Sequence, residues 1–524
     1  MGSLPDLTER SRPPPRPAAS RTISDPHRHR TQLIPVSTIC KKEWPWKKQN
    51  PARGGPASRR RDSVASSVGA ASVRRLINRQ PPKVNPLVVR RFTLLCVSSA
   101  FCATGFLPFT AFVGAEAGGM ALALMHAVAA VVAPLSPLIL QKTGVRVVIS
   151  IGHALVCVLV TGHTVDTPLP VLYILYAVCG LTLSPLSLAM TASATTFAQH
   201  AGDEGRRKVA LRRALRALRA AQDAGLVAGA LLMGAALMAW PDPALPPAAT
   251  APPNVTAPRW PPPEPEYFME DDYEEQTCGA AGCPATQSAA TSALSMEGRR
   301  VLLAVWALLA FCSISLGVFG AASTPSPPPD TSSILRDPRT LLGVPMGLFI
   351  GLQQGFIYTS YIKWYGVCVG GWACAWRALL AAGALQTLAA ATLSMAAARG
   401  RRRALAAGGA AAHASLMLAL LRWRAVKTDL ALPAVAAAAW GACAALWDVL
   451  QSGICIGGPG WRGPWSLVLS ARHLGLAASC AARQLLCASS QLLALAAALL
   501  LALASHITLE IHVRKAAEAP RHRS

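Results

Sequence analysis

Charged residues are scarce in this sequence. Asp, Glu, Lys and Arg make up 14% of its 524 residues, whereas hydrophobic residues reach 52% and the mean hydropathy is +0.36. Soluble domains carry about 25% charged residues. Because so few charges cannot solvate a soluble surface of this size, most apolar side chains must face lipid or one another. The composition therefore excludes a chain of soluble domains and predicts an all-α, multi-pass membrane protein.

Cysteines and catalytic motifs are also scarce. Fourteen Cys are too few for a secreted disulfide scaffold, and most of them lie inside apolar runs. The sequence has no Walker-type glycine loop, no His-Glu-x-x-His motif and no Cys-x-x-Cys pair. We therefore expect no enzymatic activity, no cofactor and no metal site.

The net charge of +25 is distributed unevenly. Residues 1–91 carry a net charge of +15, whereas 241–298 carry −8. A basic segment beside apolar spans marks the cytoplasmic side of a membrane more often than a nucleic-acid site, so nucleic-acid binding is disfavoured. Residues 1–88 are rich in Pro, Ser and Arg without hydrophobic periodicity, which predicts a disordered basic cytoplasmic tail.

Apolar runs of about 20 residues, the length that crosses roughly 30 Å of hydrocarbon, recur after the tail. The sequence predicts spans at residues 92–114, 119–140, 145–165, 168–195, 221–240, 300–321, 341–366, 372–397, 404–421, 431–456, 465–487 and 489–511. The last two contain Arg472 and Arg483, so eleven spans is the alternative to twelve. The expected architecture is a major-facilitator-type bundle of two six-helix halves, 89–321 and 341–511. Residues 322–340 form a cytoplasmic linker between them.

The connecting loops predict the orientation. Lys and Arg concentrate in the even-numbered loops, most densely between Arg206 and Arg219, and in the C-terminal segment 512–524. Cytoplasmic loops carry such an excess, so both termini are expected in the cytoplasm. The odd-numbered loops have few Lys and Arg. The exception is the loop after the ninth predicted span, which contains Arg422, Arg424 and Lys427. The acidic segment 241–298 is then luminal or extracellular.

Two features of the acidic segment agree with that side. Asn254-Val255-Thr256 is a glycosylation acceptor. Cys278 and Cys283 are the only Cys of the segment, and an oxidising compartment favours a disulfide between them. The alternative is a pair of exposed thiols.

Two stretches of the predicted seventh span and its approach carry a family resemblance. Arg336-Asp337-Pro338-Arg339 leads into Gly351-Leu352-Gln353-Gln354-Gly355-Phe356. This combination resembles the signature of the uncoordinated-ninety-three (UNC-93-like) family of the major facilitator superfamily, particularly its A-type members. The resemblance covers about residues 88–456. Asp448 departs from the pattern, because the family usually has Gln or Asn after the second Trp of its tenth span.

Polar side chains inside the spans are the candidate site residues, because burying them in a membrane is costly. Asp448 is expected to pair with Arg377 or Arg472 in a central cavity. Gln353 and Gln354 are expected either to line that cavity or to bond across to a neighbouring helix that the flanking glycines admit. The other intramembrane charges, Asp223, Lys363 and Arg483, are expected to snorkel to the membrane interfaces.

The N-terminal tail contains two candidate phosphorylation sites. Ser24 lies in Arg21-Thr22-Ile23-Ser24-Asp25-Pro26, and Ser63 follows the paired Arg60-Arg61 by two residues. A phosphate at either serine is expected to dock on an Arg cluster or to weaken attraction to anionic lipid.

The family resemblance implies a non-enzymatic accessory or regulatory subunit. Members of that family regulate a two-pore potassium channel in nematode muscle or escort nucleic-acid-sensing receptors to endolysosomes. The A-type resemblance favours potassium-channel regulation and ion homeostasis at the plasma membrane, with receptor escort as one alternative. The other alternative is a secondary transporter of an ion or small solute. The expected partners are membrane lipid and a potassium-channel subunit or another membrane protein.

Overall fold

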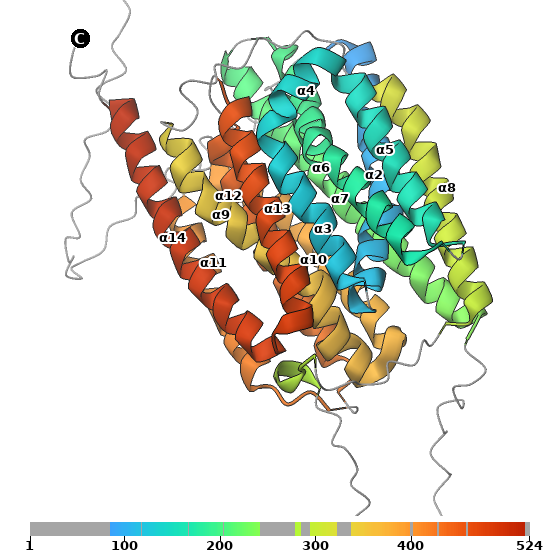
Figure 1. Cartoon of the computed structure of the whole chain (residues 1–524). Helices are drawn as coiled ribbons and strands as arrows, with labels where there is room; N and C mark the ends of the chain where they lie inside the picture. The colour runs from blue at the N-terminus through green and yellow to red at the C-terminus, as the bar shows by residue number, and fades with distance from the viewer. Residues whose placement is uncertain are drawn as a thin grey trace, which may run out of the picture. The chain divides into compact units, whose positions relative to one another are not determined.

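A computed structural model describes the chain from residue 84 to residue 518, with gaps. The described residues are 84–116, 118–165, 167–202, 204–241, 278–284, 294–321, 337–398, 402–426, 429–456 and 460–518. Within these ranges the chain is helical, with one isolated β-bridge between Pro241 and Leu294 and no strand. The helices are α2 (Pro86–Ala115), α3 (Gly119–Val132), η2 (Ala133–Leu135), α4 (Ser136–Thr143), α5 (Val145–Gly162), α6 (Leu169–Gln199), α7 (Glu204–Ala239), η3 (Gly279–Ala281), α8 (Met296–Gly320), α9 (Pro338–Phe356), η5 (Ile357–Val367), α10 (Cys368–Ala398), α11 (Arg402–Arg422), α12 (Leu432–Cys455), α13 (Arg462–Leu485) and α14 (Ala488–Glu518) (Figure 1).

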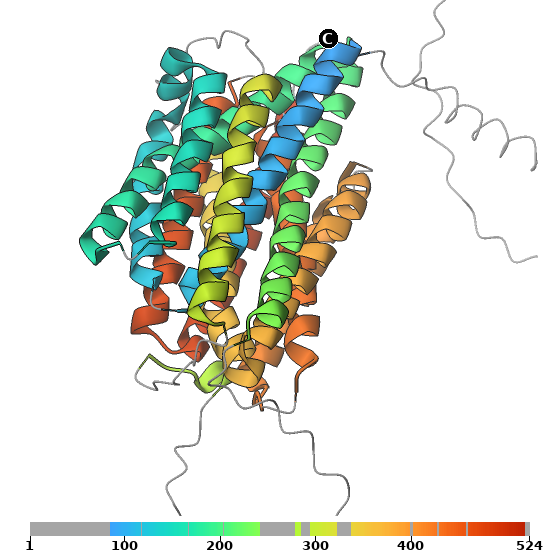
Figure 2. The ribbon, with the colours of Figure 1, turned by 90° about the vertical axis from the view of Figure 1, so that its right-hand side faces the viewer.

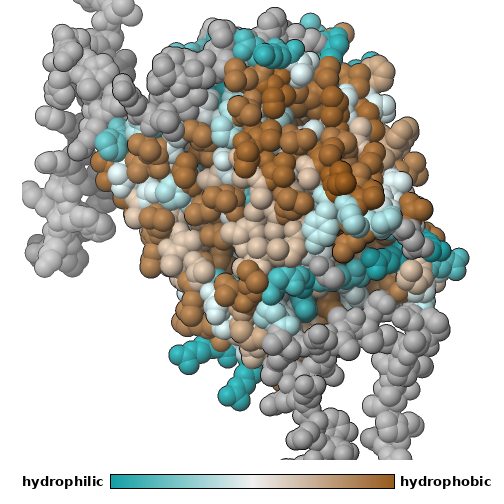
Figure 3. Space-filling view, viewed as in Figure 1, coloured by the Kyte–Doolittle hydropathy of each residue, from teal (hydrophilic) through white to brown (hydrophobic). Residues whose placement is uncertain are grey.

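Ten helical segments of the described residues are long and apolar enough to cross a membrane. One of them, Pro338–Ala397, joins α9, the π-helical η5 and α10, and its helical geometry breaks at Gly370 and Gly371. On the face shown in Figure 3, apolar side chains cover the middle of the bundle, as a lipid-facing surface requires. The chain is therefore an all-α multi-pass membrane protein, as its composition predicts.

Helix α7 corrects the predicted loop before the fifth span. The sequence places that span at 221–240 and its basic residues in a loop, but α7 already begins at Glu204. Its first turns interleave Arg with Ala and Leu, which are strong helix formers, and Lys208 pairs with Glu204 at 2.8 Å one turn away. The arginines between 206 and 219 therefore have fixed positions on a helix.

The helices form two groups. In the first group α2 packs against α7 and α8, α5 packs against α6 and α8, and α3 packs against α6. In the second group α9 packs against α13 and α14, α10 against α12, and α11 against α12 and α14. The two groups meet chiefly along α3–α13 and α7–α10 (Figure 1 and Figure 2). Each group thus has its own internal packing.

Side chains next to proline start two of these helices. Asn85 caps α2 by accepting a hydrogen bond from the Leu87 N–H at 3.0 Å, and Asp337 caps α9 by accepting one from the Arg339 N–H at 2.8 Å. Proline follows each cap at the first helical position, where its missing N–H has no cost. The Asp337-Pro338 pair of the sequence motif therefore has a structural role as a helix start.

Glycines bring α9 and α13 into backbone contact. A methyl group added at Gly351 would lie 1.9 Å from the carbonyl oxygen of Arg472, and one added at Gly475 would lie 2.3 Å from that of Leu348. Gly347 and Gly355 face α13 in the same way. The four-residue spacing of these glycines puts them on one side of α9, so the two helix axes approach closely.

The predicted disulfide between Cys278 and Cys283 is wrong, because each of these cysteines is bonded to a more distant one. Cys278 is bonded to Cys368 and Cys283 to Cys487, with Cα atoms 5.6 and 4.1 Å apart. The short helix η3 separates Cys278 from Cys283 and packs against α11, α14 and η5. Cys368 directly follows η5, and Cys487 directly precedes α14. A hydrogen bond of 2.9 Å from the Ala488 N–H to the Gly282 carbonyl fixes η3 there. The loop of the first helix group is thus bonded to the second group.

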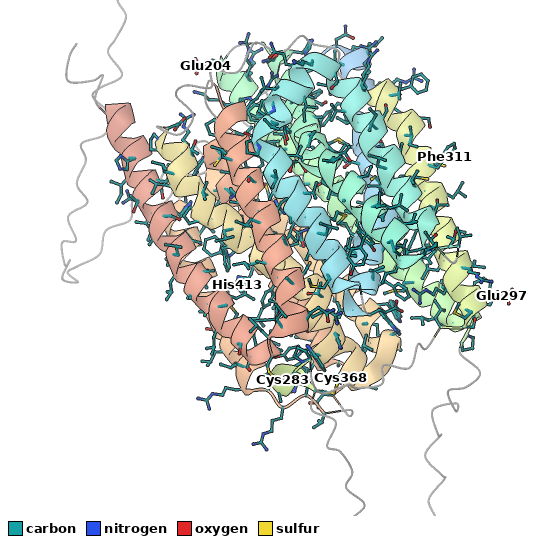
Figure 4. All side chains as sticks on the ribbon, in the orientation of Figure 1. Glu204, Cys283, Glu297, Phe311, Cys368 and His413 are labelled. Carbon is teal, nitrogen blue, oxygen red and sulfur yellow. A yellow bond between two sulfur atoms is a disulfide. The ribbon has the colours of Figure 1, made fainter. Side chains whose placement is uncertain are left out.

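The bundle has two distinct ends. Figure 4 shows Cys283 and Cys368 at one end, here named the disulfide end, and Glu204 at the other. The other end, here named the terminal end, is where α2 begins and α14 finishes.

Candidate functional site

A cavity of about 350 Å³ lies between the two helix groups. Helices α2, α6 and α7 line one side of it, and α10, α12 and α13 line the other. Its wall includes residues near the last turns of α10 and α12 and the first turn of α13, so it extends toward the terminal end. The volume falls within the range of about 300–1,000 Å³ that is typical of small-molecule sites.

Four charged side chains form a network in the wall of this cavity. Asp448 of α12 accepts from two arginines, Arg219 Nη2 at 2.6 Å and Arg472 Nη1 at 3.0 Å. Arg219 Nε also lies 3.2 Å from an oxygen of Asp223. Two carboxylates are therefore matched by two guanidinium groups, which offsets part of the cost of removing them from water. Because α7 contributes Arg219 and Asp223, the network joins the two helix groups.

Amide side chains complete the network. Arg472 Nη2 donates to Gln354 Oε1 at 2.7 Å, and Gln386 Nε2 donates to Asp223 Oδ1 at 2.9 Å. Gln354 thus lines the cavity and also bonds from α9 to α13, so it combines the two roles expected of it. Gln353 is buried beside a second, smaller pocket, and its Oε1 has no hydrogen-bond partner among the described residues.

Three sequence expectations about charged residues need correction. Arg377 is not part of the site: it is exposed on α10, where its guanidinium lies 5.7 Å from the Trp376 ring centre. Asp223 does not snorkel to an interface but is 2% exposed within the network. Arg483 is likewise buried. Since α10 turns its Gln386 side toward the network, Arg377 lies on another face.

Two histidines form a further contact across the α3–α13 seam. His126 and His473 lie with their Nδ1 atoms 3.3 Å apart and their rings stacked, and both line the cavity. His153 of α5 also reaches the cavity wall, where its Nδ1 lies 3.3 Å from the Ser98 hydroxyl. The His126–His473 contact thus joins the two helix groups, whereas the Ser98–His153 contact joins α2 to α5 within the first group.

Contacts between the two groups close the bundle toward the disulfide end. Arg483 of α13 donates to the carbonyl of Ala115 at 3.2 Å and to that of Glu116. Within the first group Glu116 pairs with Arg299 at 3.1 Å, and across the groups the ring centres of Phe112 and Trp372 lie 4.8 Å apart. Burial raises the pKa of the Glu116 carboxyl, and the Arg299 guanidinium opposes that rise. The cavity is therefore closed toward one end of the bundle and extends toward the other.

Helix α7 contributes side chains to the site that the sequence patterns above do not predict. Arg212, Arg216, Arg219 and Asp223 all line the cavity. Their spacing of four, three and four residues is that of one helical face, so the sequence already indicates that these four side chains lie on the same side of a helix. The spacing has this meaning only in a helix, and the segment between Arg206 and Arg219 was expected to be a loop.

Several predicted sites lie outside the described residues. These are the glycosylation site Asn254 and the phosphorylation sites Ser24 and Ser63. Within the described ranges, no group of three or more His, Cys, Asp or Glu side chains is arranged to hold a metal ion.

Similarity to known proteins is limited to part of the chain. No protein-family model matches the sequence. Human protein unc-93 homolog A is 30% identical over 124 residues, which is 24% of this chain. The match spans 27% of that relative, so the chain covers about a quarter of its length. The chain is thus similar to an unc-93 homolog over a limited region.

Proposed function

We propose that this chain is a non-enzymatic accessory or regulatory subunit of another membrane protein. We propose further that the partner is a potassium channel at the plasma membrane and that the outcome is ion homeostasis. The observation that carries the proposal is the local similarity to human unc-93 homolog A. The Arg336–Arg339 and Gly351–Phe356 stretches of the sequence support the same family resemblance.

The test is co-expression of the full chain with a two-pore potassium-channel subunit. We expect the two proteins to co-purify in mild detergent and the potassium current per surface channel to change. An unrelated multi-pass protein, expressed at the same surface level, is the control. Relocation of the channel to endolysosomes at unchanged current per channel would support escort instead. No co-purification together with an unchanged current would overturn the accessory proposal.

The proposed membrane arrangement has twelve crossings in two six-helix halves, 89–321 and 341–511. The two seams between the helix groups, α3–α13 and α7–α10, support it, because each seam joins one helix of each half. The terminal end is proposed to be cytoplasmic. The disulfides of Cys278 and Cys283 support this orientation, since disulfides persist in oxidising compartments. Glycosylation at Asn254 and phosphorylation at Ser24 and Ser63 are proposed on the matching sides.

The cavity favours a second candidate function, secondary transport of an ion or small solute. It lies between the two helix groups, is closed toward the disulfide end, and contains Asp448 and Arg472. A site between two halves that is closed toward one end is what alternating access requires.

Transport is tested in proteoliposomes with a panel of inorganic ions, amino acids and carboxylates. Asp448→Asn removes the charge that pairs with Arg219 and Arg472, so it is expected to abolish any uptake that wild type shows. Arg213→Gln, which changes an exposed arginine of α7 outside the cavity, is the matched control. Equal uptake by wild type and Asp448→Asn, or no uptake of any solute by wild type, would exclude the transport candidate within this panel.

A further inference from the structure

Helix α7 presents a row of arginines to the cavity. Arg212, Arg216 and Arg219 line it, whereas Arg213 is exposed and does not. At 1.5 Å per residue the row runs for about 10 Å along the helix, from the ion network toward the terminal end. The row lies on the route into the cavity from that end.

The cavity wall has more positive than negative charge. It contains five arginines and two carboxylates, a surplus of three positive charges; its charged residues are Arg212, Arg216, Arg219, Arg402, Arg472, Asp223 and Asp448. Both carboxylates are already in contact with Arg219. A concave site with low-dielectric walls and one sign of charge focuses the field and concentrates ions of the opposite sign.

Arg212 and Arg216 are available to a ligand. The Nε of Arg212 donates to the Lys208 carbonyl at 3.2 Å, and that of Arg216 donates to the Arg212 carbonyl at 3.3 Å. These bonds lie within α7 and orient the side chains, and no described carboxylate forms an ion pair with either one. Their outer guanidinium nitrogens retain the fork geometry that binds a carboxylate or phosphate through two parallel hydrogen bonds.

The wall contributed by α2, α5 and α6 carries no charged side chain and is largely apolar. Phe106 and Leu107 of α2, Val156 of α5, and Leu183 and Met190 of α6 all line the cavity. A ligand that fills the cavity would therefore meet guanidinium groups along α7 and mainly hydrocarbon on α2, α5 and α6. An inorganic anion would leave this apolar surface uncovered.

We propose that the cavity binds an amphipathic organic anion. Its carboxylate or phosphate group lies beside Arg212 and Arg216, and its apolar body packs against α2 and α6. The same chemistry is supplied by a free organic acid and by an anionic lipid. This binding is independent of the accessory proposal, because a bound anion is compatible with either a regulatory subunit or a transporter.

The test uses the full-length purified chain in nanodiscs of phosphatidylcholine. The probes are radiolabelled 4-phenylbutyrate and the matched cation 4-phenylbutylamine, and binding is measured by equilibrium dialysis. We expect wild type to bind the anion and not the cation. Losing charge-assisted hydrogen bonds in the double variant Arg212→Gln, Arg216→Gln is expected to weaken binding about tenfold or more. Arg213→Gln, its exposed neighbour, is expected to bind like wild type.

Each outcome either tests the proposal or identifies the source of the anion. Size-exclusion profiles and melting temperatures of the variants confirm that they fold. If folded wild type fails to bind the anion, or binds the cation equally well, the proposal is overturned. Equal weakening by Arg213→Gln and the double variant would overturn it as well. Adding phosphatidylglycerol to the nanodisc distinguishes the sources: displacement of the probe supports a lipid ligand, and unchanged binding supports a free organic acid.

Discussion

Replacing Gly351 by Ala tests the close approach of α9 and α13. The added methyl would lie 1.9 Å from the Arg472 carbonyl oxygen, which belongs to the backbone and cannot rotate away. Since non-bonded atoms need more than about 3 Å, the two helices must separate locally by about 1 Å or more. That movement would stretch the 2.7 Å bond between Arg472 and Gln354 beyond the hydrogen-bond range.

The expected change in the free energy of unfolding has two destabilising terms and one stabilising term. Overpacking costs about 1–3 kcal/mol, and loss of a hydrogen bond to a charged group costs about 1.5 kcal/mol or more. Alanine is the better helix former by about 1 kcal/mol, which offsets part of this. We expect a net destabilisation of about 1.5–3.5 kcal/mol.

The measurement is the apparent melting temperature of the purified chain, followed by tryptophan fluorescence. Gly408→Ala is the matched control, because Gly408 lies in α11 with no atom within 4 Å of the added methyl. We expect Gly351→Ala to melt several degrees below wild type and Gly408→Ala to melt at or slightly above it. If Gly351→Ala melts as high as Gly408→Ala, the helices are not in backbone contact and the reasoning fails.

Three further predictions concern the ion network, the disulfides and the acidic loop. Asp448→Asn removes the carboxylate charge that Arg219 and Arg472 share and is expected to cost about 3 kcal/mol; adding Arg472→Gln should cost less than the sum of the two single changes, measured by a double-mutant cycle of unfolding. Mass spectrometry of the unreduced chain should recover peptides linking Cys278 to Cys368 and Cys283 to Cys487, and a Cys278–Cys283 peptide would refute this pairing. A glycosidase-sensitive mass shift should disappear in Asn254→Gln, and its persistence would place the glycan elsewhere.

The fold class could be predicted from the sequence because it depends on helix length and hydropathy, which are summed over neighbouring residues. Helix length and hydropathy place most of the apolar helices within a few residues. The start of α7 was missed since its arginines suggested a loop, although Ala and Leu between them favour a helix. Hydropathy measures the cost of leaving water and takes no account of a charged residue that has a partner in the bundle.

Only part of the candidate site could be predicted from the sequence, because its contacts join residues that are far apart in the chain. Asp448, Arg472 and Gln354 were identified as costly intramembrane polar groups, with Arg472 as one of the two expected partners of Asp448, and the structure brings the three together. Arg219, the other partner of Asp448, comes from a helix more than 200 residues earlier in the sequence, so no local pattern links the two. The disulfide pairing failed likewise, because the true partners Cys368 and Cys487 lie beyond the loop.

Side-specific labelling tests most directly the claim that the cavity extends toward the cytoplasm and that the disulfide end faces away from it. In a background in which Cys40, the cavity-lining Cys102 and the half-buried Cys96, Cys157 and Cys312 are replaced by Ser, Ser394→Cys reports the cavity wall and Arg424→Cys reports the exposed disulfide end. The reagent is a membrane-impermeant maleimide, applied to intact cells, to cells opened with digitonin, and to cells fully solubilised. We predict that Ser394→Cys reacts once digitonin opens the plasma membrane, whereas Arg424→Cys reacts either in intact cells or only after full solubilisation. Labelling of Ser394→Cys in intact cells, or labelling of Arg424→Cys that begins with digitonin, would contradict the account.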